Sequence, residues 1–241
     1  MTDRILALET SAHAASCALV CAEKVEAFAY QDVGLTHSRT LMPMVRGLFE
    51  NSGLSLADCD YVAVAHGPGS FTGIRIGVAA AKGLAAGAGL HCVGVSTLEA
   101  MAQLVPFERS IICCSMDARR GEVYNAIFRS NGVDAPERLC ADRPITAEQA
   151  AAEARKFAEE HDFSIIHIGD GAELCYNLLI DLPSSRLAPP HLLRQSAVGV
   201  AFAAKRAIHE GRACTPDELT AVYLRLSQAE RERERARQSN S

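Results

Sequence analysis

The sequence lacks the apolar segments that direct a chain into or across a membrane. No uncharged apolar run reaches the roughly 18 residues that a membrane span requires, because Lys82 interrupts the richest stretch. The apolar run at residues 5–8 ends at Glu9, which makes it too short for the core of a signal peptide. We therefore expect a cytoplasmic protein without a membrane partner.

Motifs for metal binding and nucleophilic catalysis are also missing. The nine cysteines include no C-x-x-C pair, and the eight histidines include no H-x-x-x-H spacing. There is no G-x-S-x-G elbow, and the glycine-rich residues 67–73 lack the lysine of a P-loop and the G-x-G-x-x-G pattern. We predict no catalytic residue, no metal and no cofactor, and we expect reduced cysteines that mostly pack as small buried hydrophobes.

Positive charge is scarce as well. Lys and Arg number 24 against 29 Asp and Glu, so the formal net charge is −5. A phosphate backbone is not attracted to such a chain as a whole. Any contact with nucleic acid must come from a local patch, for which Arg75, Arg119 and Arg120 are candidates, or from a partner.

Hydrophobic periodicity predicts an α/β protein. The first half is expected to contain strands at 4–8, 14–21 and 24–30, a helix from Thr36 to Gly53, a strand at 61–65, a helix up to Gly89, a strand at 94–96 and a helix at 97–104. The second half is expected to contain strands at 111–116, 123–128 and 164–168, helices at 147–160, 172–180 and 197–209, and an extended segment at 221–226.

Length and element order predict two lobes with mixed sheets. The expected division is an N-terminal lobe at 1–105, a C-terminal lobe at 106–192, a helix and extended segment at 193–227 that pack back on the lobes, and a flexible charged tail at 228–241. Residues 106–109 are the expected crossing between the lobes.

The helix that ends near Gly89 has an unusual face of small residues. Its members fall within about 120° on a helical wheel, with Arg75 and Lys82 on the opposite side: Gly73, Gly77, Ala80, Ala81, Leu84, Gly87 and Ala88. Each glycine costs about 1 kcal/mol in a helix relative to alanine. Close approach of another helix is the simplest reason to keep them.

Several segments together resemble the TsaB (YeaZ) family of bacterial tRNA threonylcarbamoyladenosine synthesis. They are residues 9–11 (ETS), His37 and Ser38 with Leu41 and Pro43, 67–77 (GPGSFTGIRIG), 96–100 (STLEA), 117–124 (DARRGEVY) and 223–225 (YLR). The resemblance extends over nearly the whole chain, and the segment at 67–77 is its most specific part.

The resemblance implies an actin-like ATPase superfamily fold, as in sugar kinases and Hsp70, with two lobes that face a cleft. It implies a non-catalytic subunit that pairs with TsaD, the subunit that transfers threonylcarbamoyl to the adenosine 3′ of the anticodon. TsaE, an ATPase, is expected at the shared interface, tRNA is expected to be bound indirectly, and the chain alone is expected to form a homodimer. The two-histidine metal motif of TsaD is missing from this sequence.

The resemblance also implies where the partner binds. The helices at 37–51 and 73–89 are expected to form the surface that pairs with TsaD or with a second copy. The predicted interface residues are Leu41, Val45, Leu48, Gly73, Gly77, Ala80, Ala81, Leu84 and Gly87. The alternative is that both helices simply cover their own sheet, and the two interpretations are compatible if they use different faces.

A second hypothesis makes the chain an enzyme. It would bind or hydrolyse ATP in the cleft between the lobes, with Glu9, Thr10, Gly169 and Gly171 as the residues involved. A third, a peptidase, has little support because the sequence contains neither a metal motif nor a nucleophile elbow.

Overall fold

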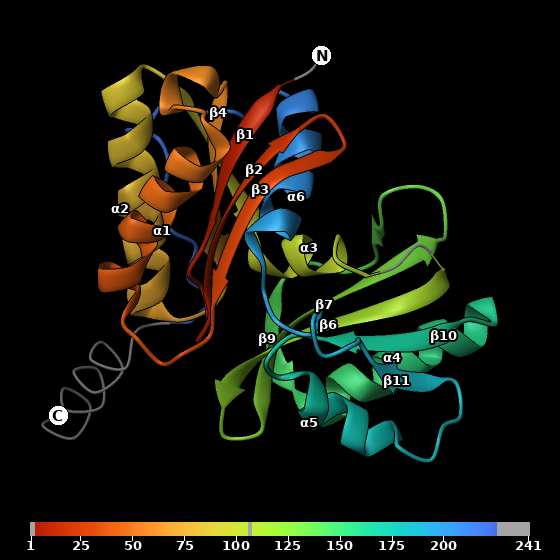
Figure 1. Ribbon diagram of the computed structural model, residues 1–241. Coiled ribbons are helices and arrows are strands. Elements are labelled where there is room, and N and C mark those ends of the chain that lie inside the picture. The colour runs from red at the N-terminus through yellow and green to blue at the C-terminus, as the bar shows by residue number, and fades with distance from the viewer. Residues whose placement is uncertain (1–2, 106–107, 226–241) are drawn as a thin grey trace, which may run out of the picture.

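The computed structural model describes residues 3–105 and 108–225. Two lobes, each built around one sheet, make up this part of the chain (Figure 1). Two sequence features fall outside it, namely Pro106 and Phe107 at the expected crossing and the charged tail predicted at 228–241. Within the described residues, no helix is long and apolar enough to cross a membrane.

The N-terminal lobe has a five-stranded mixed sheet in the order β3-β2-β1-β4-β5. Its strands are β1 (Arg4–Glu9), β2 (Ala15–Cys21), β3 (Lys24–Gln31), β4 (Tyr61–Gly67) and β5 (His91–Ser96). The strands β1, β2 and β3 pair antiparallel, whereas β4 is parallel to both β1 and β5. The three strands predicted at 4–8, 14–21 and 24–30 are confirmed, and the first two form an antiparallel hairpin.

Helices cover both faces of this sheet (Figure 1). On one face lie α1 (His37–Ser52), the short η1 (Leu56–Asp58) and α2 (Phe71–Ala88); on the other lies α6 (Ala197–His209), with α3 (Thr97–Ala102) beside it. Side chains alternate along the strands, so that Leu6 and Leu8 pack toward α1 and α2 while Ile5 and Ala7 pack toward α6. All three helices expected in the first half form, although α3 ends at Ala102 rather than at residue 104. The helix α1 continues through Pro43.

The C-terminal lobe has a six-stranded sheet in the order β11-β10-β6-β7-β8, with β9 also paired to β7. Its strands are β6 (Arg109–Arg119), β7 (Glu122–Asn131), β8 (Glu137–Arg138), β9 (Arg143–Thr146), β10 (Ser164–Ile168) and β11 (Ser185–Leu187). The helices α4 (Ala147–His161) and α5 (Ala172–Tyr176) cover one face. The other face packs against α3.

One expectation for the second half needs correction. The helix predicted at 172–180 is shorter, because α5 ends at Tyr176 and a 3₁₀ turn, η2 (Asn177–Leu179), follows it. The segment expected to be extended at 221–226 is described as far as residue 225 and belongs to neither sheet. The backbone N–H of Val222 donates to the carbonyl oxygen of His66 at 2.8 Å, and a single hydrogen bond of this kind positions a segment without making it part of a sheet.

Candidate partner-binding face and interlobe cleft

The glycine-rich face of α2 packs against the chain's own sheet. A Cβ at Gly73 would lie 2.0 Å from the carbonyl oxygen of Thr10, and one at Gly77 would lie 2.4 Å from the Thr10 hydroxyl. The Thr10 Oγ1 donates to the carbonyl oxygen of Gly73 at 2.8 Å. Glycine is therefore required here because the end of β1 approaches the backbone of α2, not because another molecule does.

Burial corrects the predicted interface. Six of its nine residues are inside the core of the N-terminal lobe: Leu41, Val45, Leu48, Gly73, Gly77 and Ala81. A side chain buried against its own sheet cannot contact a partner in this conformation, so the interpretation that these helices cover their own sheet accounts for all six. Ala80 and Leu84 are half-buried and Gly87 is exposed, and these three remain available for an interface.

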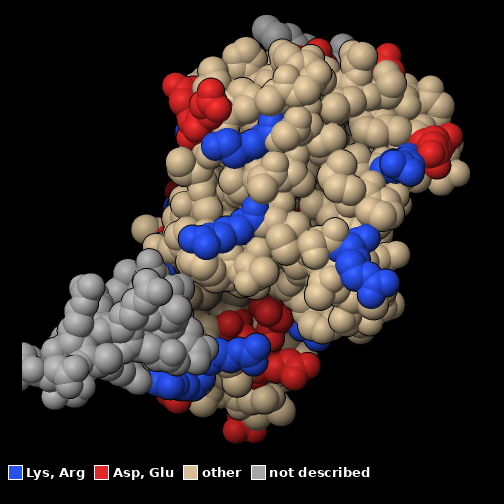
Figure 2. All heavy atoms as spheres, turned by 90° about the vertical axis from the view of Figure 1, so that its left-hand side faces the viewer, with Lys and Arg blue, Asp and Glu red and all other residues tan. Residues whose placement is uncertain are grey.

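The opposite side of the two helices forms what we call the outer face, defined by Arg39, Met42 and Arg46 of α1 and Arg75, Ala79 and Gly83 of α2. All six residues are exposed. In Figure 2 basic side chains stand apart on a broad surface that is otherwise mostly uncharged, and acidic side chains lie toward its margins. A Cβ at Gly83 or Gly87 would meet no atom within 4 Å, so these glycines are not needed for packing within the chain.

A cleft of about 580 Å³ lies between the lobes. It is lined by residues 11–13, by the first turns of α1 and α2, by residues 116–119 at the end of β6, and by residues 222–225. Ser70 caps α2 at this point, where its Oγ accepts a hydrogen bond from the backbone N–H of Gly73 at 3.2 Å. At the start of α1, the His37 Nε2 lies 2.7 Å from the carbonyl oxygen of Ala12.

Residues 222–225 connect the two lobes across this cleft. On the N-terminal lobe, the ring of Tyr223 lies 4.7 Å from the ring of Phe71, and its hydroxyl accepts a hydrogen bond from Arg75 Nε at 3.1 Å. On the C-terminal lobe, Arg225 forms an ion pair of 2.7 Å with Glu122. We call these four residues the strap.

Arg75, proposed above as a contact for RNA or nucleotide, is already engaged by the strap. Besides its bond to Tyr223, its guanidinium lies 3.9 Å from the centre of the Phe71 ring. Arg119, the last residue of β6, and Arg120, in the turn that follows, are exposed, and both have positive φ. The structure thus leaves these two arginines open to solvent and holds Arg75 against an aromatic pair.

The four residues named in the enzyme hypothesis are buried or packed closely against the backbone of neighbouring segments. Glu9 and Thr10 are fully buried, and the hydroxyl of Thr10 is used by Gly73. A Cβ at Gly169 would lie 2.1 Å from the carbonyl oxygen of Ser115, and one at Gly171 would lie 2.8 Å from the backbone nitrogen of Asp117. These residues therefore serve the packing of strand ends against turns.

Glu9 is a buried carboxyl group in an unfavourable setting. One of its oxygens accepts a hydrogen bond from the backbone N–H of Ser11 at 2.5 Å, and the other has no hydrogen-bond partner among the described residues. Burial raises the pKa of Glu9 to about 7, and the negative charge of Asp170 adds to this shift. Asp170, which accepts a hydrogen bond from Gln195 at 3.0 Å, also has a pKa raised by burial.

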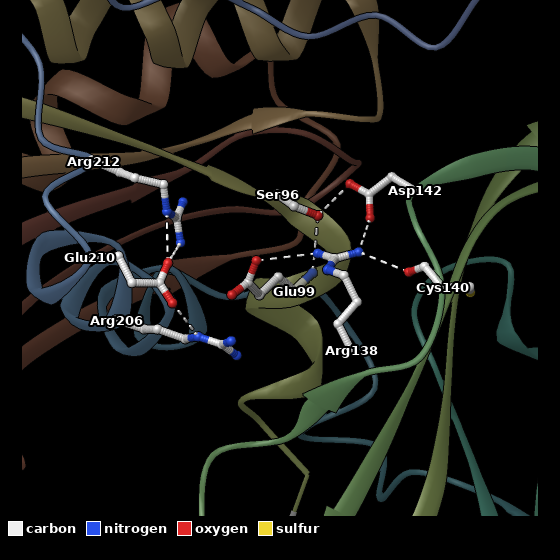
Figure 3. Close-up of polar contacts among 8 residues, drawn as sticks. All are labelled: Ser96, Glu99, Arg138, Cys140, Asp142, Arg206, Glu210 and Arg212. Atoms are coloured by element: carbon white, nitrogen blue, oxygen red, sulfur yellow. Dashed lines mark hydrogen bonds and ion pairs between the residues drawn. The ribbon is translucent and has the colours of Figure 1, made fainter.

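A polar network that joins the lobes was not foreseen from the sequence (Figure 3). Arg138 of β8 pairs with Glu99 of α3 at 3.2 Å and with Asp142 at 2.5 Å. Asp142 in turn accepts a hydrogen bond from Ser96, at the end of β5, at 2.5 Å. These side chains are half-buried and come from both lobes. The network therefore connects the two lobes.

The described residues contain no cluster of candidate metal ligands. Within 3–105 and 108–225, no three His, Cys, Asp or Glu side chains come together as a metal ion would need.

Comparison with known proteins agrees with the fold. Residues 31–224 match the family model of TsaD, described as tRNA N6-adenosine threonylcarbamoyltransferase. The TsaB protein of Bacillus subtilis, named as a tRNA threonylcarbamoyladenosine biosynthesis protein, is 31% identical over 231 residues, which cover 94% of this chain and 96% of that protein. The chain belongs to the TsaB family.

Two further TsaB proteins match over shorter lengths. The Escherichia coli protein is 42% identical over 134 residues, or 54% of this chain and 58% of that protein. The Haemophilus influenzae protein is 42% identical over 124 residues, or 50% of this chain and 51% of that protein. These alignments span little more than half the length of the two relatives, whereas the Bacillus alignment spans nearly all of it.

Solved structures confirm the predicted fold class. YeaZ from Pseudomonas aeruginosa superposes with a TM-score of 0.75 at 25% identity, over 92% of this chain and all of that chain. Component A of (R)-2-hydroxyglutaryl-CoA dehydratase from Acidaminococcus fermentans has a TM-score of 0.50 at 11% identity, which concerns the fold alone. The two lobes with mixed sheets have the predicted fold, that of actin-like ATPases.

Proposed function

We propose that the chain is a non-catalytic subunit of the bacterial complex that adds threonylcarbamoyl to the adenosine 3′ of the anticodon in tRNA. It pairs with TsaD and stimulates it, with TsaE at the shared interface, and it forms a homodimer when alone. It acts in the cytoplasm, where the tRNA is modified. The observation that carries the proposal is the similarity to a TsaB protein over 94% of this chain and 96% of that relative.

Two structural observations support a role through contact rather than catalysis. The polar groups proposed for a cleft enzyme are buried or already bonded, as Glu9 and Thr10 illustrate. The outer face, in contrast, is exposed and is not needed to cover the chain's own sheet. With a net charge of −5, the chain leaves most of the phosphate contacts to its partner.

The interface that we propose consists of the outer face together with Ala80, Leu84 and Gly87. The division into a lobe at 1–105, a lobe at 106–192 and a returning segment at 193–227 also stays a proposal. It is supported by the packing of α6 on the sheet of the N-terminal lobe.

An omission assay tests this function. TsaD, TsaE, the enzyme that makes threonylcarbamoyl-adenylate, tRNA, ATP, threonine and bicarbonate are combined with and without this chain, and modified adenosine is measured by mass spectrometry. We expect product only when the chain is present, and none from the chain alone. Equal product without the chain would contradict the proposal.

A matched pair of variants locates the surface within the same assay. Gly83→Trp adds a large side chain where the isolated chain has open space, so it should block pairing without disturbing the fold. Glu159→Trp makes a comparable change at an exposed position of α4 in the other lobe. We expect loss of product with the first variant and normal product with the second.

A further inference from the structure

Two cysteines far apart in the sequence face each other at the edge of the N-terminal sheet. Cys92 lies in β5, the last strand in the order β3-β2-β1-β4-β5, and Cys214 lies opposite it in the segment that follows α6. The backbone N–H of Cys92 donates to the carbonyl oxygen of Cys214 at 2.8 Å, and the N–H of Cys214 donates to the carbonyl oxygen of Cys92 at 2.9 Å. The two residues therefore form a hydrogen-bonded antiparallel pair.

This pairing places the two thiols within reach of a disulfide bond. The Cα atoms of a hydrogen-bonded antiparallel pair are about 5.5 Å apart, and disulfides usually join Cα atoms about 4.4–6.8 Å apart. Residues directly opposite each other point their side chains to the same face, and both cysteines pack on the side of the sheet that α1 and α2 cover. Rotation of the two side chains is therefore the main movement that bond formation requires.

The two thiols differ in their access to solvent and have only weak partners to give up. The Cys92 thiol donates to the carbonyl oxygen of Ala81 at 3.8 Å, and the Cys214 thiol donates to the carbonyl oxygen of Cys92 at 3.6 Å. Thiols are weak donors, so little is lost when these bonds break. Cys92 is fully buried and Cys214 is half-buried, so an oxidant from solvent reaches Cys214 first.

The segment that carries the second cysteine leads to the strap. Lys82 of α2 donates to the carbonyl oxygens of Asp217 and Leu219, both at 3.2 Å. Further along, the N–H of Val222 donates to the carbonyl oxygen of His66 at 2.8 Å. Each of these contacts is a single hydrogen bond, so a covalent link at the start of the segment would fix the base of the strap to the N-terminal lobe.

We propose that Cys92 and Cys214 form an oxidation site, at which hydrogen peroxide converts the two thiols into a disulfide that fastens residues 214–225 to β5. The Cys214 thiolate attacks one peroxide oxygen, the O–O bond breaks, hydroxide leaves, and Cys214 becomes a sulfenic acid. The Cys92 sulfur then attacks the Cys214 sulfur, the S–S bond forms as the S–O bond breaks, and the hydroxyl group leaves as water with the Cys92 proton. Two thiols and one peroxide thus give one disulfide and two water molecules.

Burial controls how fast the site reacts. It raises the pKa of both thiols, that of Cys92 to about 11, while the positive charge of Lys82 offsets part of the shift. Because the thiolate is the reactive form, oxidation at neutral pH should take minutes to hours. The site therefore responds to sustained rather than brief exposure to peroxide. Neither step involves a partner protein, so the inference is independent of the proposed function.

Peptide mapping by mass spectrometry without reductant tests this with the full chain. The folded chain is incubated with and without hydrogen peroxide, the remaining thiols are alkylated after unfolding, and linked peptides are identified. We expect a Cys92–Cys214 linkage in most of the oxidised molecules, reversed by dithiothreitol. Cys113 and Cys175 of the C-terminal lobe, which are both fully buried, should stay reduced.

Variants report the order of the two steps. In Cys92→Ala the sulfenic acid at Cys214 has no thiol to react with, so dimedone should trap several-fold more of it than in the wild type. Cys214→Ala should give neither the linkage nor a trapped acid at Cys92. The control Cys140→Ala removes another half-buried thiol, in the other lobe, and should leave the linkage unchanged. Circular dichroism establishes that the variants fold, and the result for the wild type stands without them.

The link should also change the behaviour of the segment. Proteolytic cleavage within residues 214–225 should slow by about fivefold or more, because local opening is restricted. Tm should rise by about 4 °C or more, because the link closes a long loop. A folded, oxidised chain without the Cys92–Cys214 linkage would overturn the inference, as would linkage of Cys214 to a different cysteine. A linkage that leaves the cleavage rate unchanged would overturn its fastening role.

Discussion

Two alanine substitutions in α2 should change stability in opposite directions. In Gly73→Ala the new Cβ would lie 2.0 Å from the backbone oxygen of Thr10, whereas in Gly83→Ala the new Cβ would meet no atom within 4 Å. Both exchange glycine for alanine within the same helix. The comparison therefore separates contact with the sheet from helix propensity.

The magnitudes follow from the two environments. Overpacking of a tight site costs about 1–3 kcal/mol, and the contact at Gly73 is with backbone, which cannot rotate away. Because the contact is with backbone and is as short as 2.0 Å, the cost should lie in the upper part of that range, about 2–3 kcal/mol. Helix propensity returns at most about 1 kcal/mol, so Gly73→Ala should lose about 1–2 kcal/mol. Gly83→Ala should gain about 0.5–1 kcal/mol.

Thermal unfolding followed by circular dichroism measures both effects. For a chain of this size, 1 kcal/mol corresponds to about 2–4 °C in Tm. We expect Gly73→Ala to unfold at least about 2 °C below the wild type and Gly83→Ala above it. A Gly73→Ala variant as stable as the wild type would refute the conclusion that this face of α2 is held against the chain's own sheet.

Three other perturbations have defined outcomes. Arg138→Ala leaves two half-buried carboxylates without their cation, so the chain should lose about 1–3 kcal/mol of stability and its Tm should fall by several degrees. The control Arg155→Ala should leave Tm unchanged. Equal Tm values for Arg138→Ala and the wild type in calorimetry would contradict the interlobe role. The folded-state pKa of Glu9 is raised from 4.5 to about 7, so the folded chain binds the extra proton and stability falls as pH rises from about 4.5 to 7. Glu9→Gln stays neutral, so its free energy of unfolding relative to the wild type should rise over that interval by an amount on the order of 3 kcal/mol. A constant difference in unfolding free energy between pH 5 and 8 would refute this. Arg225→Ala removes the ion pair with Glu122 and should speed proteolytic cleavage at residues 222–225 with little change in Tm, whereas unchanged cleavage would show that the pair does not hold the strap.

The sequence was sufficient for elements whose patterns are local. The spacing of Leu41, Met44, Val45 and Leu48 predicted α1, and all four are buried as that pattern requires. The apolar runs of β1 and β2 predicted the opening hairpin. Strands of two to four residues, such as β8 and β9, were missed because so short a segment carries no measurable period.

The site was harder to predict, because its contacts join residues far apart in the chain. The small residues of α2 indicated close packing, but only the structure identifies the neighbour as Thr10, 63 positions before Gly73. The pairing of Arg138 with Glu99 spans 39 positions, and no spacing rule links them. Composition thus predicted that α2 is approached closely, and the structure decided which face meets the sheet and which meets solvent.

The most direct test of the central claim is a titration of this chain into the transferase reaction at fixed TsaD, with modified adenosine measured by mass spectrometry over time. The account predicts that the rate rises with added chain and saturates near one chain per TsaD, and that Gly83→Trp gives no rise. A rate that is independent of the chain at every ratio would contradict it.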